Sequence, residues 1–316
     1  MPSTKLIQQL KNRRVFFISF FLTAALTQAT ESNMKKIEVQ GHRGARARAP
    51  ENTLPAFQHA LEIGADGIEL DMAVTKDQVI VISHNPFISR EICLDQNGSR
   101  LSDQPLIHSL TLAEVKSYDC GTIQNSKFPN QVPVPKTKIP TLEEVFSLVQ
   151  NSPLPAAKTL RFNIETKIYS KHPKYTVDPK TFTDLAIKAF KESGFIDRII
   201  LESFDPRTLV LAKEQEPTLK TSLLVDHNVW SKIRVPFFHP NLLSRAKRFG
   251  VDIISPNYEL IVDHPEIVDK LQKSGIQVFP WTVNDPNAWN KLIAMKVDGI
   301  ITDDPAMLLK TMGRIN

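Results

Sequence analysis

Short apolar runs alternate with amphipathic segments along most of the chain, a pattern typical of repeated strand–helix units. Eight helices are predicted, at residues 53–63, 142–150, 182–193, 206–213, 242–249, 265–273, 286–295 and 305–310. Eight apolar runs are predicted as strands, which begin at Ile37, Ile68, Thr159, Arg198, Lys220, Val251, Ile276 and Gly299. The run that begins at Ile276 is predicted to extend to Val283. Regular alternation of this kind predicts parallel strands, and eight repeats predict a (β/α)8 TIM barrel.

The alternation stops after the second strand region, where residues 86–140 are rich in prolines and turn-forming residues. Within this insertion, residues 111–117 have the pattern of one short helix. A long irregular segment after a barrel strand commonly shapes the mouth of the functional site. Both cysteines of the chain, Cys93 and Cys120, lie here. We expect them to form a disulfide in an oxidising compartment, with two separate buried thiols as the alternative.

Residues 1–29 have the order of a secretory signal peptide: a basic start, an apolar run from Val15 to Leu26, and small residues after it. We therefore expect a periplasmic or secreted protein with one catalytic barrel domain at residues 35–316. The apolar run is shorter than the ~20 residues that span a bilayer, and no later run is long enough. An uncleaved membrane anchor and translation from Met34, which would make the protein cytoplasmic, are the alternatives.

The charge of the chain argues against nucleic acid as a partner. The formal net charge is +5, but residues 1–29 contain four lysines and arginines and no acidic residue, so the remainder is nearly neutral. No basic cluster interleaved with aromatic residues follows. The expected partner is therefore a small molecule.

Two pairs of polar residues on predicted strands carry the candidate chemistry. Because side chains alternate along a strand, Glu69 and Asp71 point to one face while their neighbours point to the other. Two carboxylates on one face of a buried strand need a cation or a proton between them. Glu165 and Lys167 repeat this spacing on the third strand. A solvated edge strand for the first pair, and a structural salt bridge for the second, are the alternatives.

Residues 41–85 resemble the signature of the glycerophosphodiester phosphodiesterase family. The order and spacing of the matching pieces are more specific than any single piece. The sequence departs from the family at Asn85, where the family usually has aspartate after the histidine. The matching pieces are His42-Arg43-Gly44, Pro50-Glu51-Asn52-Thr53, Ala56-Phe57, Gly64-Ala65-Asp66, Ile68-Glu69-Leu70-Asp71, Thr75 and His84.

The resemblance implies a TIM-barrel enzyme that hydrolyses glycerophosphodiesters to sn-glycerol 3-phosphate and an alcohol. It implies one divalent cation, and an all-carboxylate ligand set favours Ca²⁺ or Mg²⁺. The implied metal ligands are Glu69, Asp71 and Glu165, and the implied phosphate-binding residues are Arg43 and Lys167.

Two histidines are candidates for general acid–base catalysis. His42 and His84 follow predicted strands next to the acids, unlike the other six histidines. An imidazole suits proton transfer near neutral pH. The ends of the last four strands are expected to form walls, and Trp281 is either a wall of the substrate pocket or a core residue.

Two other functions are alternatives to this reading. A lysophospholipase D-type phosphodiesterase on the same barrel would share the histidines and acids, but acyl chains require a more apolar mouth than the polar, proline-rich insertion offers. A non-catalytic binding module would lack a histidine or a metal-binding acid, and none is missing from this sequence.

Overall fold

The computed structural model describes residues 36–228 and 242–315, so the predicted signal peptide lies outside the described residues. Eight parallel strands of the described chain form one sheet in the order β8-β7-β6-β5-β4-β2-β1-β9. A further strand, β3 (Ile80–Ile82), pairs antiparallel with β2 and was not predicted as a separate strand. The parallel strands are β1 (Glu38–Gly41), β2 (Gly67–Val74), β4 (Arg161–Thr166), β5 (Ile199–Ser203), β6 (Lys220–Val225), β7 (Ile253–Pro256), β8 (Gln277–Val278) and β9 (Gly299–Thr302).

Backbone hydrogen bonds between β9 and the segment around β8 bring the two ends of the sheet together as a barrel. The amide of Asp298 donates to the carbonyl oxygen of Val278 at 3.0 Å, and the amide of Ile301 donates to that of Pro280 at 3.0 Å. The strand predicted at 276–283 is too long, since β8 ends at Val278 in the structure. Pro280 has no N–H to donate to a neighbouring strand. The predicted (β/α)8 barrel is confirmed.

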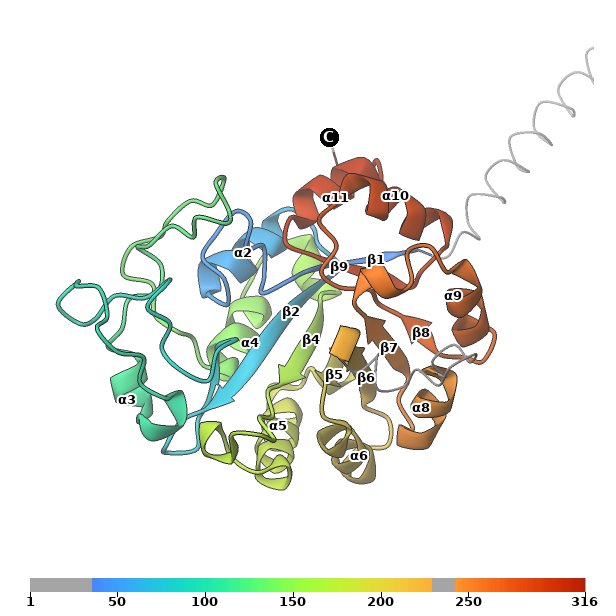
Figure 1. Cartoon of the computed structure of the whole chain (residues 1–316). Coiled ribbons are helices and arrows are strands. Elements are labelled where there is room, and N and C mark those ends of the chain that lie inside the picture. Colours follow the sequence, from blue (N-terminus) through green and yellow to red (C-terminus); the bar gives the residue numbers. More distant parts are fainter. Residues whose placement is uncertain (1–35, 229–241, 316) are drawn as a thin grey trace, which may run out of the picture. The chain divides into compact units, whose positions relative to one another are not determined.

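Of the nine α-helices in the described residues, all but α3 (Leu112–Val115) lie around the outside of the strands (Figure 1). Several begin with an aspartate cap followed by proline, as at Asp178-Pro179 and Asp285-Pro286. The aspartate accepts a hydrogen bond from a free backbone N–H, and proline at the first position has none to satisfy. The predicted helix bounds agree with the structure or differ by a few residues at their ends. The outer helices are α2 (Leu54–Glu62), α4 (Leu142–Gln150), α5 (Pro179–Ser193), α6 (Pro206–Gln215), α8 (Leu242–Phe249), α9 (Pro265–Gln272), α10 (Pro286–Ala294) and α11 (Pro305–Thr311).

Apolar side chains pack in two layers on either side of the strands. The larger layer lies between strands and helices and includes Ile199 and Leu201. The smaller layer includes Ile200 and Ile301, with Trp281 packed against it. Because successive side chains of a strand point to opposite faces, β5 contributes to both layers.

The insertion forms a small core of its own. Between β3 and α4 the regular elements are η1 (Ile107–Ser109) and α3 (Leu112–Val115). A disulfide joins Cys93 to Cys120 inside this core. The insertion also contacts the loop after β1, because the side chain of Gln131 donates to the carbonyl oxygen of Arg46 at 2.7 Å. No helix among residues 36–228 and 242–315 is long and apolar enough to cross a membrane.

Candidate active site

A tight turn after β1 places His42 and Arg43 at the carboxyl ends of the strands. The turn requires a left-handed backbone, since φ is +52° at Arg43 and +84° at Gly44. A Cβ atom on Gly44 would lie 2.8 Å from the Cβ of Ala56, so only glycine fits against α2 at this position. The amide of His42 donates to the carbonyl oxygen of Thr302 at 2.8 Å, which ties the turn to β9.

The three predicted metal-binding acids lie together. Glu69 and Asp71 on β2 and Glu165 on β4 each offer an oxygen, and these oxygens lie within 4.8 Å of one another. All three residues are at most 5% exposed. Parallel pairing of β2 with β4 places Asp71 opposite Glu165, which explains how residues far apart in the sequence share one face. The structure thus brings together the acids that the sequence singled out.

Two cationic side chains surround these acids. The ammonium of Lys167 bridges two of them, 2.7 Å from Oε2 of Glu165 and 2.9 Å from Oδ1 of Asp71. The backbone amide of Arg43 donates to Oε2 of Glu69 at 2.7 Å. The Nε atom of its guanidinium lies 3.5 Å from Oδ2 of Asp71, and Nη1 lies 2.7 Å from Oε1 of Glu51. Both predicted phosphate-binding residues therefore lie at the acid cluster.

His42 contacts an aspartate from the other end of the chain. Its Nδ1 atom lies 2.7 Å from Oδ1 of Asp303, and its Nε2 atom lies 3.8 Å from Oε2 of Glu69. Arg46 and Asn284 hold the aspartate from two sides, with contacts of 2.5 Å from Arg46 Nε to Oδ1 and 2.7 Å from Asn284 Nδ2 to Oδ2. Asp303 therefore fixes the ring of His42 with Nε2 directed towards the acids.

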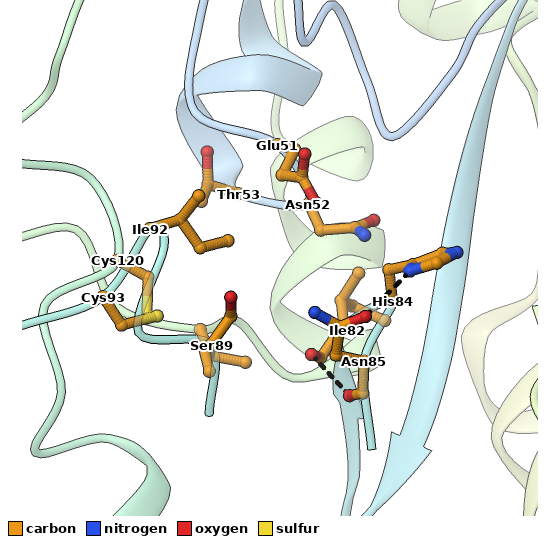
Figure 2. Close-up of a pocket in the computed structure, with 12 residues that line it drawn as sticks. Glu51, Asn52, Thr53, Ile82, His84, Asn85, Ser89, Ile92, Cys93 and Cys120 are labelled. Atoms are coloured by element: carbon orange, nitrogen blue, oxygen red, sulfur yellow. Dashed lines mark hydrogen bonds between the residues drawn. A yellow bond between two sulfur atoms is a disulfide. The ribbon is translucent and has the colours of Figure 1, made fainter. Parts of the chain in front are cut away.

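His84 has a neutral partner. Its Nδ1 atom lies 3.2 Å from Oδ1 of Asn85, the residue at which the sequence departs from the family signature. Figure 2 places both residues on one side of a small cavity and the Cys93–Cys120 disulfide on the other. The cavity has a volume of about 20 Å³, which suffices for one water molecule. The insertion thus builds the wall behind His84.

Burial and like charges raise the pKa values of two of the three acids, whereas neighbouring cations lower that of the third. Burial, together with the charge of Asp71, raises the pKa of Glu69 well above its ordinary value. Burial also acts on Asp71, but the charges of Lys167 and Arg43 and the hydrogen bond from Asn52 together outweigh it and hold the pKa of this carboxyl well below the ordinary value. Burial raises the pKa of Glu165 to about 7 against the opposing charge of Lys167. A buried cluster of crowded carboxylates fits a site for a hard divalent cation, whose charge favours their ionised forms.

Both histidines are neutral at pH 7 in the absence of substrate. Burial, reinforced by the charge of Arg46, lowers the pKa of His42 to about 4, although the hydrogen bond to Asp303 opposes this. Burial also lowers the pKa of His84 to about 4, with the charge of Asp71 opposing it and that of Lys167 adding to it. A neutral imidazole has one nitrogen that can accept a proton, as general base catalysis requires.

Most of these side chains line one cavity of about 290 Å³, whose lining residues do not include Asp71 or Asp303. Its other walls come from the later strands and include Trp281, whose indole lies edge-on to Phe204 with ring centroids 5.6 Å apart. Glu202 also lines it, and burial with the charge of Glu165 raises the pKa of this carboxyl to about 8. The other predicted residues in the cavity lining are His42, Arg43, Glu69, His84, Glu165 and Lys167.

Sequence reasoning missed three residues of this cavity and its surroundings. Asp303 and Arg46 were not identified as partners of His42, and Glu202 was not singled out. Residues of the last strands and their ends line the cavity, and Asp303, which follows β9, also hydrogen-bonds to His42. The sequence contains a weak indication of Asp303 and Glu202, because each stands at the carboxyl end of a predicted barrel strand.

Comparisons with known proteins agree with this geometry. The model of the Glycerophosphoryl diester phosphodiesterase family matches residues 42–307. A glycerophosphodiester phosphodiesterase from Caldanaerobacter subterraneus subsp. tengcongensis is 35% identical over 274 residues, which cover 87% of this chain and 97% of that protein. A lysophospholipase D from Homo sapiens is 27% identical over 288 residues, covering 84% of this chain and 83% of that protein.

The fold has relatives among solved structures. The crystal structure of a candidate glycerophosphoryl diester phosphodiesterase from Silicibacter pomeroyi DSS-3 superposes with a TM-score of 0.80 and 25% sequence identity. The superposition covers 88% of this chain and 93% of that chain.

Proposed function

The chain belongs to the glycerophosphoryl diester phosphodiesterase family, and we propose that it hydrolyses glycerophosphodiesters to sn-glycerol 3-phosphate and an alcohol. One observation carries this proposal: a buried cluster of three carboxylates is flanked by two histidines, an arginine and a lysine, and all of these residues except Asp71 line a single cavity. Cationic groups around one point suit a phosphodiester, whose transition state gathers negative charge on its non-bridging oxygens.

We propose that Glu69, Asp71 and Glu165 hold one divalent cation, Ca²⁺ or Mg²⁺. Their all-oxygen donor set is the one that these hard cations prefer. The chemistry that such a cation supplies when bound is stabilisation of the negative charge that builds up on the phosphoryl oxygens.

Arg43 and Lys167 are the proposed phosphate-binding residues. Both side chains lie against the acid cluster, are only 13% and 12% exposed, and line the cavity, so their charges act in a site largely shielded from water. Each of them already contacts Asp71, which fixes its position before substrate enters. A phosphodiester monoanion placed between them gains charge-assisted hydrogen bonds on two sides.

His42 is the proposed general base. When Nδ1–H donates to Asp303, the lone pair of Nε2 faces the acid cluster and can take a proton from the nucleophile. His84 is the proposed general acid that returns a proton to the leaving alkoxide. Its pKa is low in the free protein, and the negative charge of a bound phosphodiester raises it towards the working range.

We further propose that the protein is exported. The basic and then apolar order of residues 1–29 motivates this, and the disulfide between Cys93 and Cys120 is consistent with an oxidising compartment.

A panel of phosphodiesters tests the function. Glycerophosphocholine, glycerophosphoethanolamine and glycerophosphoglycerol should each release sn-glycerol 3-phosphate, measured with a coupled dehydrogenase assay. The similarity to a human lysophospholipase D makes lysophosphatidylcholine the necessary comparison. A kcat/KM that is highest for lysophosphatidylcholine would favour the lysophospholipase D-type alternative, and no turnover of any member would contradict both.

A further inference from the structure

The residues that line the 290 Å³ cavity are of two chemically different groups. One group contains the histidines, two of the three clustered acids and the cationic residues, where the proposed function places the phosphate. The other group is mainly aromatic and aliphatic. The members of this second group are Glu202, Phe204, Leu224, Trp281, Thr282 and Ile301.

The two aromatic residues of the second group, Trp281 and Phe204, are held in a fixed orientation. The indole Nε1 of Trp281 donates to the carbonyl oxygen of Ser255 at 2.7 Å. The ring of Phe204 meets the indole at 87°. Such rings offer a flat apolar surface to a short carbon skeleton, but they do not distinguish a polyol from a plain alkyl chain.

Glu202 is the one acidic residue of the second group. It lies on β5, where parallel pairing places it opposite Glu165 on one side and Ser222 on the other. Its side chain is only 2% exposed, and its Oε2 atom accepts a hydrogen bond from Nδ2 of Asn163 at 2.8 Å. Because one oxygen is held in this way, the other is available to a group inside the cavity that Glu202 lines.

We propose that Glu202 binds a hydroxyl group of the glycerol moiety and thereby selects glycerol over alkyl phosphodiesters, an inference that rests on the proposed phosphodiesterase activity. A hydroxyl both donates and accepts, so the bond forms with either protonation state of the carboxyl. Glu202 is outside the cluster of three acids proposed to hold the cation. Its role is therefore in substrate selection, distinct from charge stabilisation at the phosphate.

The strength of this selection follows from the environment. Without a hydroxyl, a buried carboxyl oxygen loses its water and gains no partner, so an analogue lacking the hydroxyl binds less well. One hydrogen bond of this kind corresponds to a preference of about 10- to 100-fold in kcat/KM.

The test compares two substrates that differ only in these hydroxyls. Glycerophosphocholine and propyl phosphocholine are assayed with the parent, E202A, E202Q and the control S222A. Ser222 is the register neighbour of Glu202 on β6, and it bonds to Ser255 at 2.7 Å without lining the cavity. Because Glu202 borders the cavity, water can enter the space left in E202A, and E202Q keeps the shape of the side chain.

We expect the ratio of the two kcat/KM values to fall at least about 10-fold in E202A, to take an intermediate value in E202Q, and to stay unchanged in S222A. The proposal is contradicted if E202A and E202Q keep the parent ratio, including the case in which both substrates lose activity in proportion. Failure of the proposed function gives a different result, because the parent itself would then cleave neither diester.

Discussion

The Nδ1 atom of His42 lies 2.7 Å from Oδ1 of Asp303, although 261 positions separate the two residues in the sequence. His42 follows the first strand of the barrel and Asp303 follows the last, and β1 pairs with β9 along its whole length. The proposed general base therefore depends on the pairing of the chain's two ends. This contact fixes which nitrogen of His42 faces the acids.

Replacing Asp303 by asparagine should lower kcat by roughly 10²–10⁴-fold, because His42 loses the acceptor that sets its tautomer. The carboxylate also raises the pKa of His42 against burial and Arg46, so its loss makes the imidazole a weaker base. Asp304→Asn is the matched control, since Asp304 caps α11 and contacts Arg48. Equal rates for the two variants would contradict the positioning role of Asp303.

The same substitution should change how stability depends on pH. Burial raises the pKa of Asp303, but the hydrogen bond from His42 and the charge of Arg46 outweigh it, so the folded pKa lies below its ordinary value. The ionised carboxylate thus stabilises the fold above its unfolded pKa of about 4, and this contribution disappears as pH falls further. Urea unfolding of parent and Asp303→Asn at several pH values should give a difference that shrinks below pH ~4. A constant difference would rule out this linkage.

Loss of either proposed catalytic histidine should abolish most activity without unfolding the protein. We expect His42→Ala and His84→Ala each to lower kcat at least about 100-fold, the effect of removing a positioned acid or base. His59→Ala is the control, because His59 lies on α2 with a partly exposed side chain. Thermal melts should be close to the parent for all three. Near-parent kcat of His84→Ala on diesters with both good and poor leaving alcohols would show that His84 is not the acid.

Glu69→Gln should weaken cation binding and activity together. Removing one carboxylate from an all-oxygen set should lower the affinity for Ca²⁺ and Mg²⁺ at least about 10-fold. Isothermal titration calorimetry of the chelator-treated protein measures this independently of turnover. Glu62→Gln, at the end of α2 and exposed, is the control. The metal assignment fails if Glu69→Gln binds both cations as tightly as the parent.

The disulfide of the insertion should stabilise the protein. Cys93 and Cys120 are 27 positions apart, and closing a loop of this size contributes about 3 kcal/mol to the free energy of unfolding by the loop-entropy estimate. The double variant Cys93→Ser, Cys120→Ser should lose about this amount, and the parent should match it after reduction. Intact-mass measurement of exported protein checks both the bond and cleavage of the signal peptide. Free thiols, or a mass that begins at Met1, would contradict the proposed export.

Features that depend on neighbouring residues could be predicted from the sequence. Thr141 followed by Glu144 predicts the start of α4, and the structure contains that capping box. The spacing of Glu69 and Asp71 predicts their common face for the same local reason. The strand expected at 276–283 shows the limit of this reasoning, since apolar character alone did not account for Pro280.

Features that depend on closure of the barrel could not be predicted. Strand ends converge at one edge, which places Asp303 near the site in general terms but does not select His42 as its partner. For Glu202, the alternation of side chains along a strand predicts only that it points into the barrel. Only the packed structure shows that Glu202 lines the same cavity as Trp281 and Phe204.

The central claim is that this cavity hydrolyses a glycerophosphodiester and that a cation held by its acids is required. ³¹P NMR of glycerophosphocholine incubated with the chelator-treated protein, before and after addition of Ca²⁺ or Mg²⁺, tests both parts at once. We predict no reaction before addition and, after it, growth of the sn-glycerol 3-phosphate resonance as the diester resonance disappears. Hydrolysis at the full rate in the presence of chelator, or a phosphocholine resonance in place of sn-glycerol 3-phosphate, would contradict the account.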